Sequence, residues 1–266
     1  MTVRIAIVGA NGRVGAELCL RLGSREDIEV IPIVRNRTGS AFLRISGMEC
    51  RHGRVENPDE ARRLLADCDL VLNLAYAFPR SRAGHRANVA TVTNVVEAAP
   101  AGALVALAST IMVYAPNLRV RAPGAYGLEK LLLERVFLRT ASRCKRLPFI
   151  LRIGHVLGDL QPLSAQILCD IRLSPIVLPD GGERPSNTVF AATLAEATEL
   201  IAGGTVCANT YDLVTDPQWT WRRVYNFHGA NAGLSMEVNT LPPPGGITSA
   251  VKHIASGSLS LLARPE

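Results

Sequence analysis

The sequence predicts an α/β protein built on a doubly wound parallel sheet, followed by a small C-terminal lobe. A β-branched segment at the N-terminus leads into three evenly spaced glycines. Apolar strand-like runs then alternate with amphipathic helical segments up to about residue 158, after which prolines loosen the pattern. We therefore expect a core over residues 1–158 and a small lobe over residues 159–266 that is interleaved with late strands of the core.

Composition limits the classes of protein that fit. A chain of 266 residues, 48% hydrophobic and 20% charged, suits one large domain or one domain with a small appendage. The first strand begins without a leader, and no apolar run approaches the roughly 18 residues of a membrane span. The six cysteines lack paired spacing and histidine companions, so we expect reduced, mostly buried thiols in a cytoplasmic protein, with no metal site.

The net charge of +6 raises the question of a nucleic-acid partner. The arginines are spread along the chain rather than clustered, and aromatic residues make up only 5% of it. An acidic small-molecule ligand explains the charge better than nucleic acid does.

The stretch from Val3 to Gly15 reads as a strand, a tight turn and the start of a helix. Gly9 allows a sharp turn, Gly12 allows backbone to approach a pyrophosphate, and Gly15 allows the helix to pack against the strand. The free N–H groups of the helix N-terminus would face the anion. This pattern predicts a dinucleotide-binding turn; the alternative is an ordinary strand-to-helix connection.

The other elements follow in order along the chain. Further core strands are expected at residues 29–34, 48–52, 69–75, 103–109 and 149–153, and helices at 58–66, 83–98 and 126–142. In the lobe region, helices are expected near 164–171 and 194–201, a strand at 210–214 and a helix opening at Thr220. A loop is expected at residues 242–246, and the last twenty residues are expected to form a helix or a frayed end. No role is assigned to residues 229–266.

The helix at residues 126–142 carries apolar side chains over more than one stripe. Such a helix must be buried on two sides. One side would cover the sheet and the other a second subunit, which predicts a homodimer; the alternative is a monomer with a covering segment.

Arg35 follows the second strand, about 20 residues beyond the glycine turn. Enzymes that use NAD usually place a carboxylate there, whereas those that use NADP place an arginine for the 2′-phosphate. Arg35 therefore favours NADP(H) over NAD; the alternative is a solvated loop arginine.

Tyr126 and Lys130 are four residues apart and so share one helical face. A nearby ammonium and the positive nicotinamide of an oxidised cofactor would favour the phenolate, which makes the tyrosine a candidate acid–base. The lysine can also hold the nicotinamide ribose. Ser109 and Thr110 add hydroxyl groups at the end of a preceding strand.

With these pieces in place, the chain resembles the extended short-chain dehydrogenase/reductase family, the NAD-dependent epimerase/dehydratase group with a Rossmann core. The resemblance extends from residue 3 to about 158 and rests on the segments 9–15, 69–75, 88–94 with 97–99, 108–114, 126–130 and 151–158; residues 210–213 and 220–221 resemble later elements. It implies that Thr110 binds the substrate oxygen, Tyr126 is the acid–base and Lys130 is its partner. It also implies a pyrophosphate site at Gly9, Gly12, Arg13, Val14 and Gly15, an adenine site bordered by Arg54 and Val55, and a ribose and nicotinamide site at Leu74, Ala75, Ile153 and Lys130.

Departures from the family pattern narrow the reaction. Ile111 and Met112 follow Thr110 where sugar-nucleotide dehydratases have Asp-Glu, so dehydration is not expected. The stretch from Thr110 to Tyr126 is shorter than in most nucleotide-sugar members of the family. Residues 191–193 stand where the family usually has an acidic stretch, and the C-terminal lobe is small for a bulky nucleotide-sugar.

Three functions remain. The first is an NADP(H)-dependent oxidoreductase that reduces a carbonyl, such as that of a keto-sugar or nucleotide-linked sugar, with Tyr126 as proton donor. The second is a nucleotide-sugar epimerase that uses the same residues with tightly held NAD(P). The third, a non-catalytic dinucleotide sensor, has no need of Thr110, Tyr126 and Lys130. The substrate itself stays open.

Overall fold

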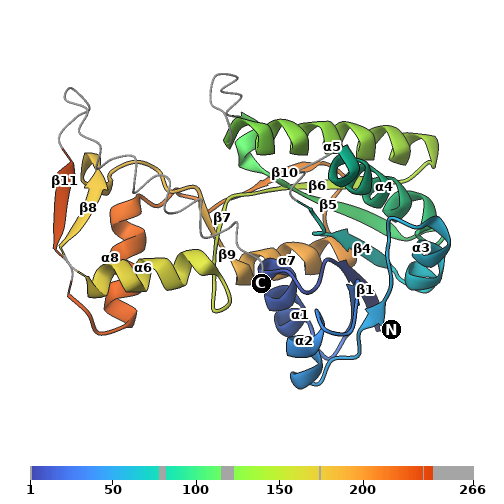
Figure 1. Ribbon diagram of the computed structural model, residues 1–266, viewed down its shortest axis with the longest axis horizontal. Coiled ribbons are helices and arrows are strands. Elements are labelled where there is room, and N and C mark those ends of the chain that lie inside the picture. Colours follow the sequence, from blue (N-terminus) through green and yellow to red (C-terminus); the bar gives the residue numbers. More distant parts are fainter. Residues whose placement is uncertain (1, 78–81, 115–122, 174, 236, 242–266) are drawn as a thin grey trace. The chain divides into compact units, whose positions relative to one another are not determined.

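The structure is a computed structural model that describes residues 2–77, 82–114, 123–173, 175–235 and 237–241 (Figure 1). The chain forms two compact units. The first comprises Met1–Ile167 and Asn187–Trp219, and the second comprises Leu168–Ser186 and Thr220–Glu266. The predicted turn at residues 242–246 and the last twenty residues lie outside the described residues.

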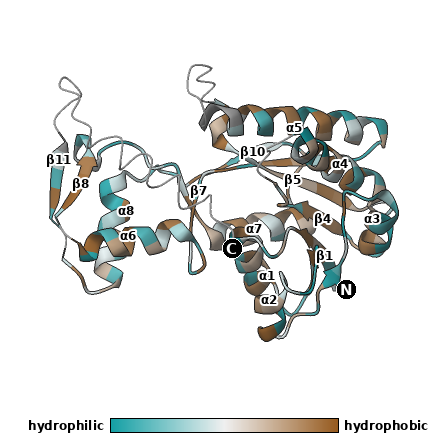
Figure 2. Ribbon diagram, viewed as in Figure 1, coloured by the Kyte–Doolittle hydropathy of each residue, from teal (hydrophilic) through white to brown (hydrophobic). Residues whose placement is uncertain are grey.

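The first unit contains a seven-stranded sheet in which every pair of neighbouring strands is parallel. In spatial order its strands are β10 (Thr210–Leu213), β6 (Pro148–Ile153), β5 (Leu104–Thr110), β4 (Leu70–Asn73), β1 (Val3–Val8), β2 (Ile28–Val34) and β3 (Arg51–His52). The order reverses between β1 and β4, which confirms the predicted doubly wound sheet. The central strands are hydrophobic along their length (Figure 2) because helices cover both faces.

Each face of the sheet has its own apolar core. On one face lie α1 (Arg13–Leu22), α2 (Ala41–Ile45) and α7 (Ala191–Ala202), and on the other α3 (Pro58–Leu65), α4 (Arg82–Ala98) and α5 (Pro123–Arg143) (Figure 1). Leu18 and Leu22 of α1 are buried in the first core. Leu64 and Phe137 are buried in the second.

Helix α3 begins where the sequence predicts and shows why. The side chain of Asn57 accepts hydrogen bonds from the backbone N–H groups of Asp59 and Glu60, and Pro58 occupies the first helical position. Both features satisfy or remove N–H groups that a helix start leaves unpaired.

Short elements were not predicted. They are α2 and the strands β7 (His155–Leu157), β8 (Ile176–Pro179), β9 (Thr188–Phe190) and β11 (Val238–Leu241). Strands β7 and β9 pair in the first unit, and β8 and β11 pair in the second. Three to five residues are too few to display a hydrophobic period.

Two further helices complete the chain. Helix α6 (Pro162–Arg172) spans the boundary between the units, and α8 (Trp221–Asn231) lies in the second. Thr220 caps α8 by accepting a hydrogen bond from the backbone N–H of Arg223, in agreement with the predicted helix start.

The cysteines require a correction. All six are free thiols, but only Cys19 and Cys68 are buried; Cys50 and Cys144 are half-buried, and Cys169 and Cys207 are exposed. The expectation of mostly buried thiols fails because Cys169 lies on the exposed face of α6 and Cys207 lies in the connection before β10. Within the described ranges, no cluster of His, Cys, Asp and Glu side chains could hold a metal ion. No helix in those ranges is long and apolar enough to cross a membrane.

Candidate active site

The glycine turn between β1 and α1 depends on two glycines for different reasons. Gly9 has φ +87°, and a Cβ there would lie 2.8 Å from the backbone nitrogen of Ala75. A Cβ on Gly15 would lie 2.5 Å from the carbonyl oxygen of Gly9. Side chains at these positions would push α1 away from the turn and β1 away from the segment after β4. The start of α1 has no side-chain cap, so its N–H groups remain available to an anion.

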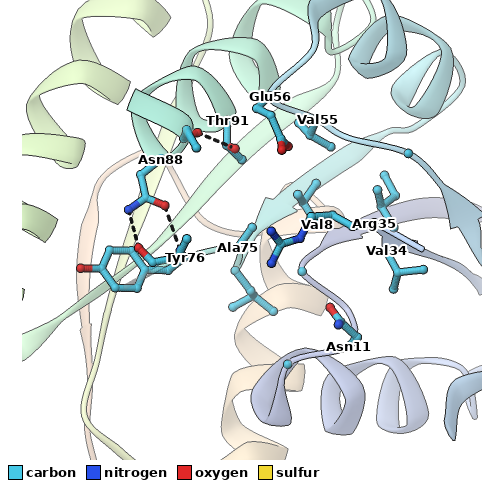
Figure 3. A pocket seen from close by; sticks show the side chains of 17 residues that line it. Val8, Asn11, Val34, Arg35, Val55, Glu56, Ala75, Tyr76, Asn88 and Thr91 are labelled. Atoms are coloured by element: carbon cyan, nitrogen blue, oxygen red, sulfur yellow. Dashed lines mark hydrogen bonds between the residues drawn. The ribbon is translucent and has the colours of Figure 1, made fainter. Parts of the chain in front are cut away.

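A cavity of about 280 Å³ opens beside this turn, at the carboxyl ends of β1, β2 and β4 (Figure 3). Parallel α/β sheets bind ligands at such a crevice, where the strand order reverses. The cavity is lined by Val8, Gly9, Asn11, Gly12, Ile33, Val34, Arg35, Gly53, Val55, Glu56, Leu74, Ala75, Tyr76, Ala77, Ala87, Asn88 and Thr91.

The cavity brings together only part of the predicted cofactor site. The predicted residues on its wall are Gly9, Gly12, Arg35, Val55, Leu74 and Ala75. Arg13, Val14 and Gly15 form the first turn of α1 instead. Ile153 ends β6, where it pairs with Thr110 of β5.

Charged side chains mark the end of the cavity near β2 and β3. Arg35 points into the cavity (Figure 3), is exposed, and has no hydrogen bond or ion pair with any described residue. Glu56 lies on the same wall, which the sequence analysis missed. Arg54 does not line the cavity; its guanidinium pairs with the Glu56 carboxylate at 2.9 Å. This end therefore holds one unpaired cation and one carboxylate that is already neutralised.

Two asparagines fix the segment after β4. The amide of Asn88, buried on α4, accepts a hydrogen bond from the backbone N–H of Ala77 and donates one to its carbonyl (Figure 3), at 2.9 and 2.8 Å. Asn73, the last residue of β4, accepts one from the N–H of Ala75 at 3.0 Å. Both lie in segments that carry the family resemblance, but no local pattern indicates that they hold this wall of the cavity.

The predicted catalytic side chains lie on β5 and α5. Thr110 is buried at the end of β5, and its hydroxyl accepts a hydrogen bond from the backbone N–H of Met112 at 3.3 Å. Lys130 is also buried, and its ammonium donates to the carbonyl oxygen of Ala108 at 3.0 Å. Tyr126 stands one turn before Lys130, with the ammonium 5.9 Å from its ring centroid.

Tyr76, which the sequence analysis did not single out, completes this corner. Its ring makes an edge-to-face contact with the ring of Tyr126, with centroids 5.2 Å apart and planes at 79°. The Lys130 ammonium lies 4.6 Å from the centroid of the Tyr76 ring. Tyr76 is the member of this trio that lines the cavity.

Burial changes the acid–base properties expected of the pair. It raises the pKa of Tyr126 to about 12 and lowers the pKa of Lys130 to about 8. In this structure the loss of solvation is the dominant influence on the pKa of Tyr126, with the ammonium 5.9 Å from the ring centroid. The expectation that Lys130 and an oxidised nicotinamide together favour the phenolate stays a prediction. The protonated phenol can donate a proton, whereas accepting one requires the phenolate that Lys130 and an oxidised nicotinamide would favour.

A polar network lies behind the end of β5. Ser109 donates a hydrogen bond to buried Glu134 of α5, and Arg152 of β6 donates to both oxygens of Glu134 at 3.1 and 2.8 Å. Arg152 also donates to the hydroxyl of Tyr114, which donates to Asp212 at 3.0 Å. These contacts tie the end of β5 to α5, the two elements that carry the predicted catalytic residues. The hydrogen bond to Glu134 raises the pKa of Arg152.

Comparisons with known proteins identify the family and the fold. The sequence profile described as "NAD dependent epimerase/dehydratase family" matches residues 5–173, more than half of the chain. A search of curated proteins finds no significant match.

Solved structures are similar over most of the chain. The UDP-glucose 4-epimerase of Thermus thermophilus, in complex with NAD, has 21% identity and a TM-score of 0.65, over 96% of this chain and 93% of that one. The UDP-N-acetylglucosamine 4-epimerase of Bacillus cereus has 16% identity and a TM-score of 0.71, over 96% and 93%. The dTDP-glucose 4,6-dehydratase of Bacillus anthracis, in complex with NAD, has 13% identity and a TM-score of 0.69, over 96% and 91%. At these identities the likeness establishes the fold.

Proposed function

This chain belongs to the NAD dependent epimerase/dehydratase family, and from that premise we propose that it is an epimerase of nucleotide-linked sugars with a tightly held nicotinamide dinucleotide. The observation that carries the proposal is the placement of Tyr126 and Lys130 on α5, joined through Tyr76 to the cavity beside the glycine turn. The solved relatives that support it include a UDP-glucose 4-epimerase bound to NAD.

The residues present fit a dinucleotide. The backbone at Gly9 and Gly15 leaves no room for a Cβ, and Gly12 opens the start of α1 toward the cavity. Arg35 would meet the adenosine ribose end, and the N–H groups at the start of α1 would hold the pyrophosphate. When bound, the nicotinamide would accept a hydride from one substrate carbon and return it.

The side chains of this protein then have defined tasks. Thr110, at the end of β5, would orient the reacting oxygen of the substrate. Tyr126 would take the hydroxyl proton as that carbon is oxidised and give it back on reduction. Lys130 would hold the ribose and stabilise the phenolate form of Tyr126, the form that accepts this proton. The assignment of substrate binding to residues 159–266 is also part of this proposal.

A second candidate, an NADP(H)-dependent carbonyl reductase, is favoured by one observation. Arg35 points into the cavity without a partner among the described residues, as a site for a 2′-phosphate requires. In this case Tyr126 would donate its proton once, to the oxygen of the reduced carbonyl, and the oxidised cofactor would leave.

One experiment separates the two candidates. The purified protein is denatured and any released nucleotide is identified by mass spectrometry, and UDP-sugars deuterated at the reacting carbon are then supplied. Epimerisation with deuterium retained and no net change in absorbance at 340 nm supports the first candidate. Stoichiometric consumption of NADPH with a ketone supports the second candidate. If the protein holds a dinucleotide but shows neither activity, the result supports the non-catalytic dinucleotide sensor.

We also propose that the protein is a homodimer through α5. Leu128 and Leu132 lie one turn apart on this helix with 49% and 38% of their surface exposed, and Leu138 is 43% exposed, whereas Leu133 and Phe137 are buried against the sheet. A second copy of α5 would cover these leucines. Sedimentation of the natural chain and of the variant L128E/L132E measures the association; a natural chain that sediments as a monomer would contradict it.

A further inference from the structure

The buried ammonium of Lys130 has an unusual set of neighbours. An ammonium carries three N–H donors. Among the described residues its one hydrogen-bond partner is the neutral carbonyl of Ala108. Lys130 is only 5% exposed, so bulk water has little access to the ammonium.

The carboxylates nearest to this ammonium are engaged elsewhere. Glu129, next to it on α5, lies 2.8 Å from the ring nitrogen Nδ1 of His85 on α4. Glu134, one turn further along α5, is held by Ser109 and Arg152. Neither forms an ion pair with Lys130, although both favour its charged form at longer range.

The ring of Tyr76, and not a carboxylate, lies beside the ammonium of Lys130. An ammonium 4.6 Å from a ring centroid is within the range of a cation–π contact, which strengthens where water is excluded. The same ring contacts the ring of Tyr126 in an edge-to-face arrangement. One side chain therefore touches both members of the pair.

We propose that Tyr76 is a positioning residue for Tyr126 and Lys130: its ring holds the ammonium against the Ala108 carbonyl, orients the Tyr126 ring and forms the wall between the pair and the cavity. The contacts exist whatever the reaction is; only the consequence for turnover rests on the proposed function. A ligand that fills the cavity meets Tyr76 before it meets Lys130, because Tyr76 lines the cavity and Lys130 does not.

The sequence offers a direct way to measure this. It contains three lysines, Lys130, Lys145 and Lys252, so peptides that carry each can be separated. Lys145 is exposed and serves as an internal reference. Competitive acetylation with trace acetic anhydride, followed by mass spectrometry across pH 6 to 11, gives the midpoint at which each amine becomes reactive.

The variants are Y76F, which keeps the ring, and Y76L and Y76A, which remove it. We expect Y76F to leave the Lys130 midpoint within a few tenths of a pH unit of the natural value. Y76L should lower it by roughly half a pH unit to one unit, because the ammonium loses the cation–π contact while an apolar side chain still keeps water out. Y76A, which opens space for water, should raise it toward that of Lys145, because hydration of a buried ion regains more than one cation–π contact provides. Circular dichroism confirms folding, and Y76L retains apolar volume should Y76A fail to fold.

Two results would overturn the proposal. An unchanged midpoint in both Y76L and Y76A would show that the ring does not hold the ammonium. The same shift in Y76F as in Y76L would assign the effect to the hydroxyl. Repeating the titration with saturating NAD⁺ or NADP⁺ tests the proposed function separately: absence of protection of Lys130 in the natural chain counts against the dinucleotide site and leaves the result on Tyr76 standing.

Discussion

The cavity and its neighbouring corner hold positive charge in opposite ways. Beside the ends of β4 and β5, Lys130 is buried near two tyrosine rings, and its pKa falls to about 8. At the tips of β2 and β3, Arg35 is exposed and has no partner among the described residues, while Glu56 beside it is paired with Arg54.

This difference assigns the proton transfer to the buried corner around Lys130 and the selection between dinucleotides to the exposed end around Arg35. A proton donor must have a pKa that its surroundings control, which requires burial, because solvent weakens the effect of every neighbouring charge. A side chain that selects between two forms of a cofactor needs only an uncommitted charge at the correct place. Changes at the buried corner should therefore affect turnover and stability, whereas changes at the exposed end should affect the affinity for one dinucleotide over the other.

The largest effect should follow loss of the proton donor. The variant Y126F keeps the ring and its contact with Tyr76, so fold and cofactor affinity should be retained. Turnover should fall by about 10² to 10⁴, the usual contribution of a general acid–base group. The comparison is made on the substrate identified for the natural chain, by initial rates and by dinucleotide titration; near-normal turnover in Y126F would remove Tyr126 from its assigned role.

The second effect is at the exposed end. A charge-assisted hydrogen bond from Arg35 to a 2′-phosphate contributes roughly 1.5 to 3 kcal/mol, so the natural chain should prefer NADP⁺ to NAD⁺ by about ten- to a hundred-fold or more. The variant R35A should lose most of this preference and keep its affinity for NAD⁺. Dissociation constants for both nucleotides are measured by titration.

A parallel variant, R37A, shows how much of the phosphate contact Arg37 shares. Equal affinities for the two nucleotides in the natural chain, or a preference for NAD⁺, would contradict the NADP assignment and strengthen the case for an epimerase that holds NAD.

The two regions also differ in how far sequence could predict them. Tyr126 and Lys130 are identifiable because their spacing places them on one face of a helix, and Arg35 because it follows a strand at a fixed distance from the glycine turn. Tyr76 was missed because its role depends on a contact between the segment after β4 and a helix 50 residues later in the chain, which no local spacing reveals.

Local spacing also fails to predict which charged side chains reach the cavity. The sequence showed no carboxylate at the tip of β2, but Glu56 reaches the cavity from the segment after β3, and only the pairing of strands places it there. Glu134 and Arg152 gave a usable signal, since each is a charged residue within an apolar run, as expected of a buried ion pair. Residue propensities and hydrophobic periodicity thus predicted the sheet and its main helices. They did not predict which side chains from different elements are buried against one another.

The third prediction concerns the stability cost of the buried lysine. The pKa of Lys130 is about 8 when folded and near 10.5 when unfolded, so the unfolded chain binds the proton more tightly. Below pH 8 the full cost, at most about 3 kcal/mol, opposes folding; it declines as pH rises from 8 to 10.5 because the folded chain loses the proton first. The variant K130M should therefore be more stable than the natural chain by about 1 to 3 kcal/mol at pH 7, although turnover and cofactor affinity fall.

Urea unfolding at pH 7 and pH 10.5 measures this, with K145M as the matched control because Lys145 is exposed. The gain in K130M should shrink at the higher pH, and K145M should show none at either. A loss of stability in K130M at pH 7 would mean that the surroundings of the ammonium more than offset its desolvation.

The smallest effect tests whether the Arg54–Glu56 pair matters to selectivity. The pair is exposed on the arginine side, at 64% of its side-chain surface, so it contributes under about 1 kcal/mol to stability. Its removal in R54A should leave the Glu56 carboxylate uncompensated on the wall that also carries Arg35. A 2′-phosphate would then meet a nearby negative charge, so affinity for NADP⁺ should fall by about two- to five-fold, and less at high salt, since added ions screen exposed charges. Affinity for NAD⁺, which lacks that phosphate, should not change.

The matched control is R62A: Arg62 is also 64% exposed and paired with a carboxylate, that of Asp59, but neither residue lines the cavity. Equal losses for both nucleotides in R54A, or the same loss in R62A, would show that the exposed end selects through Arg35 alone.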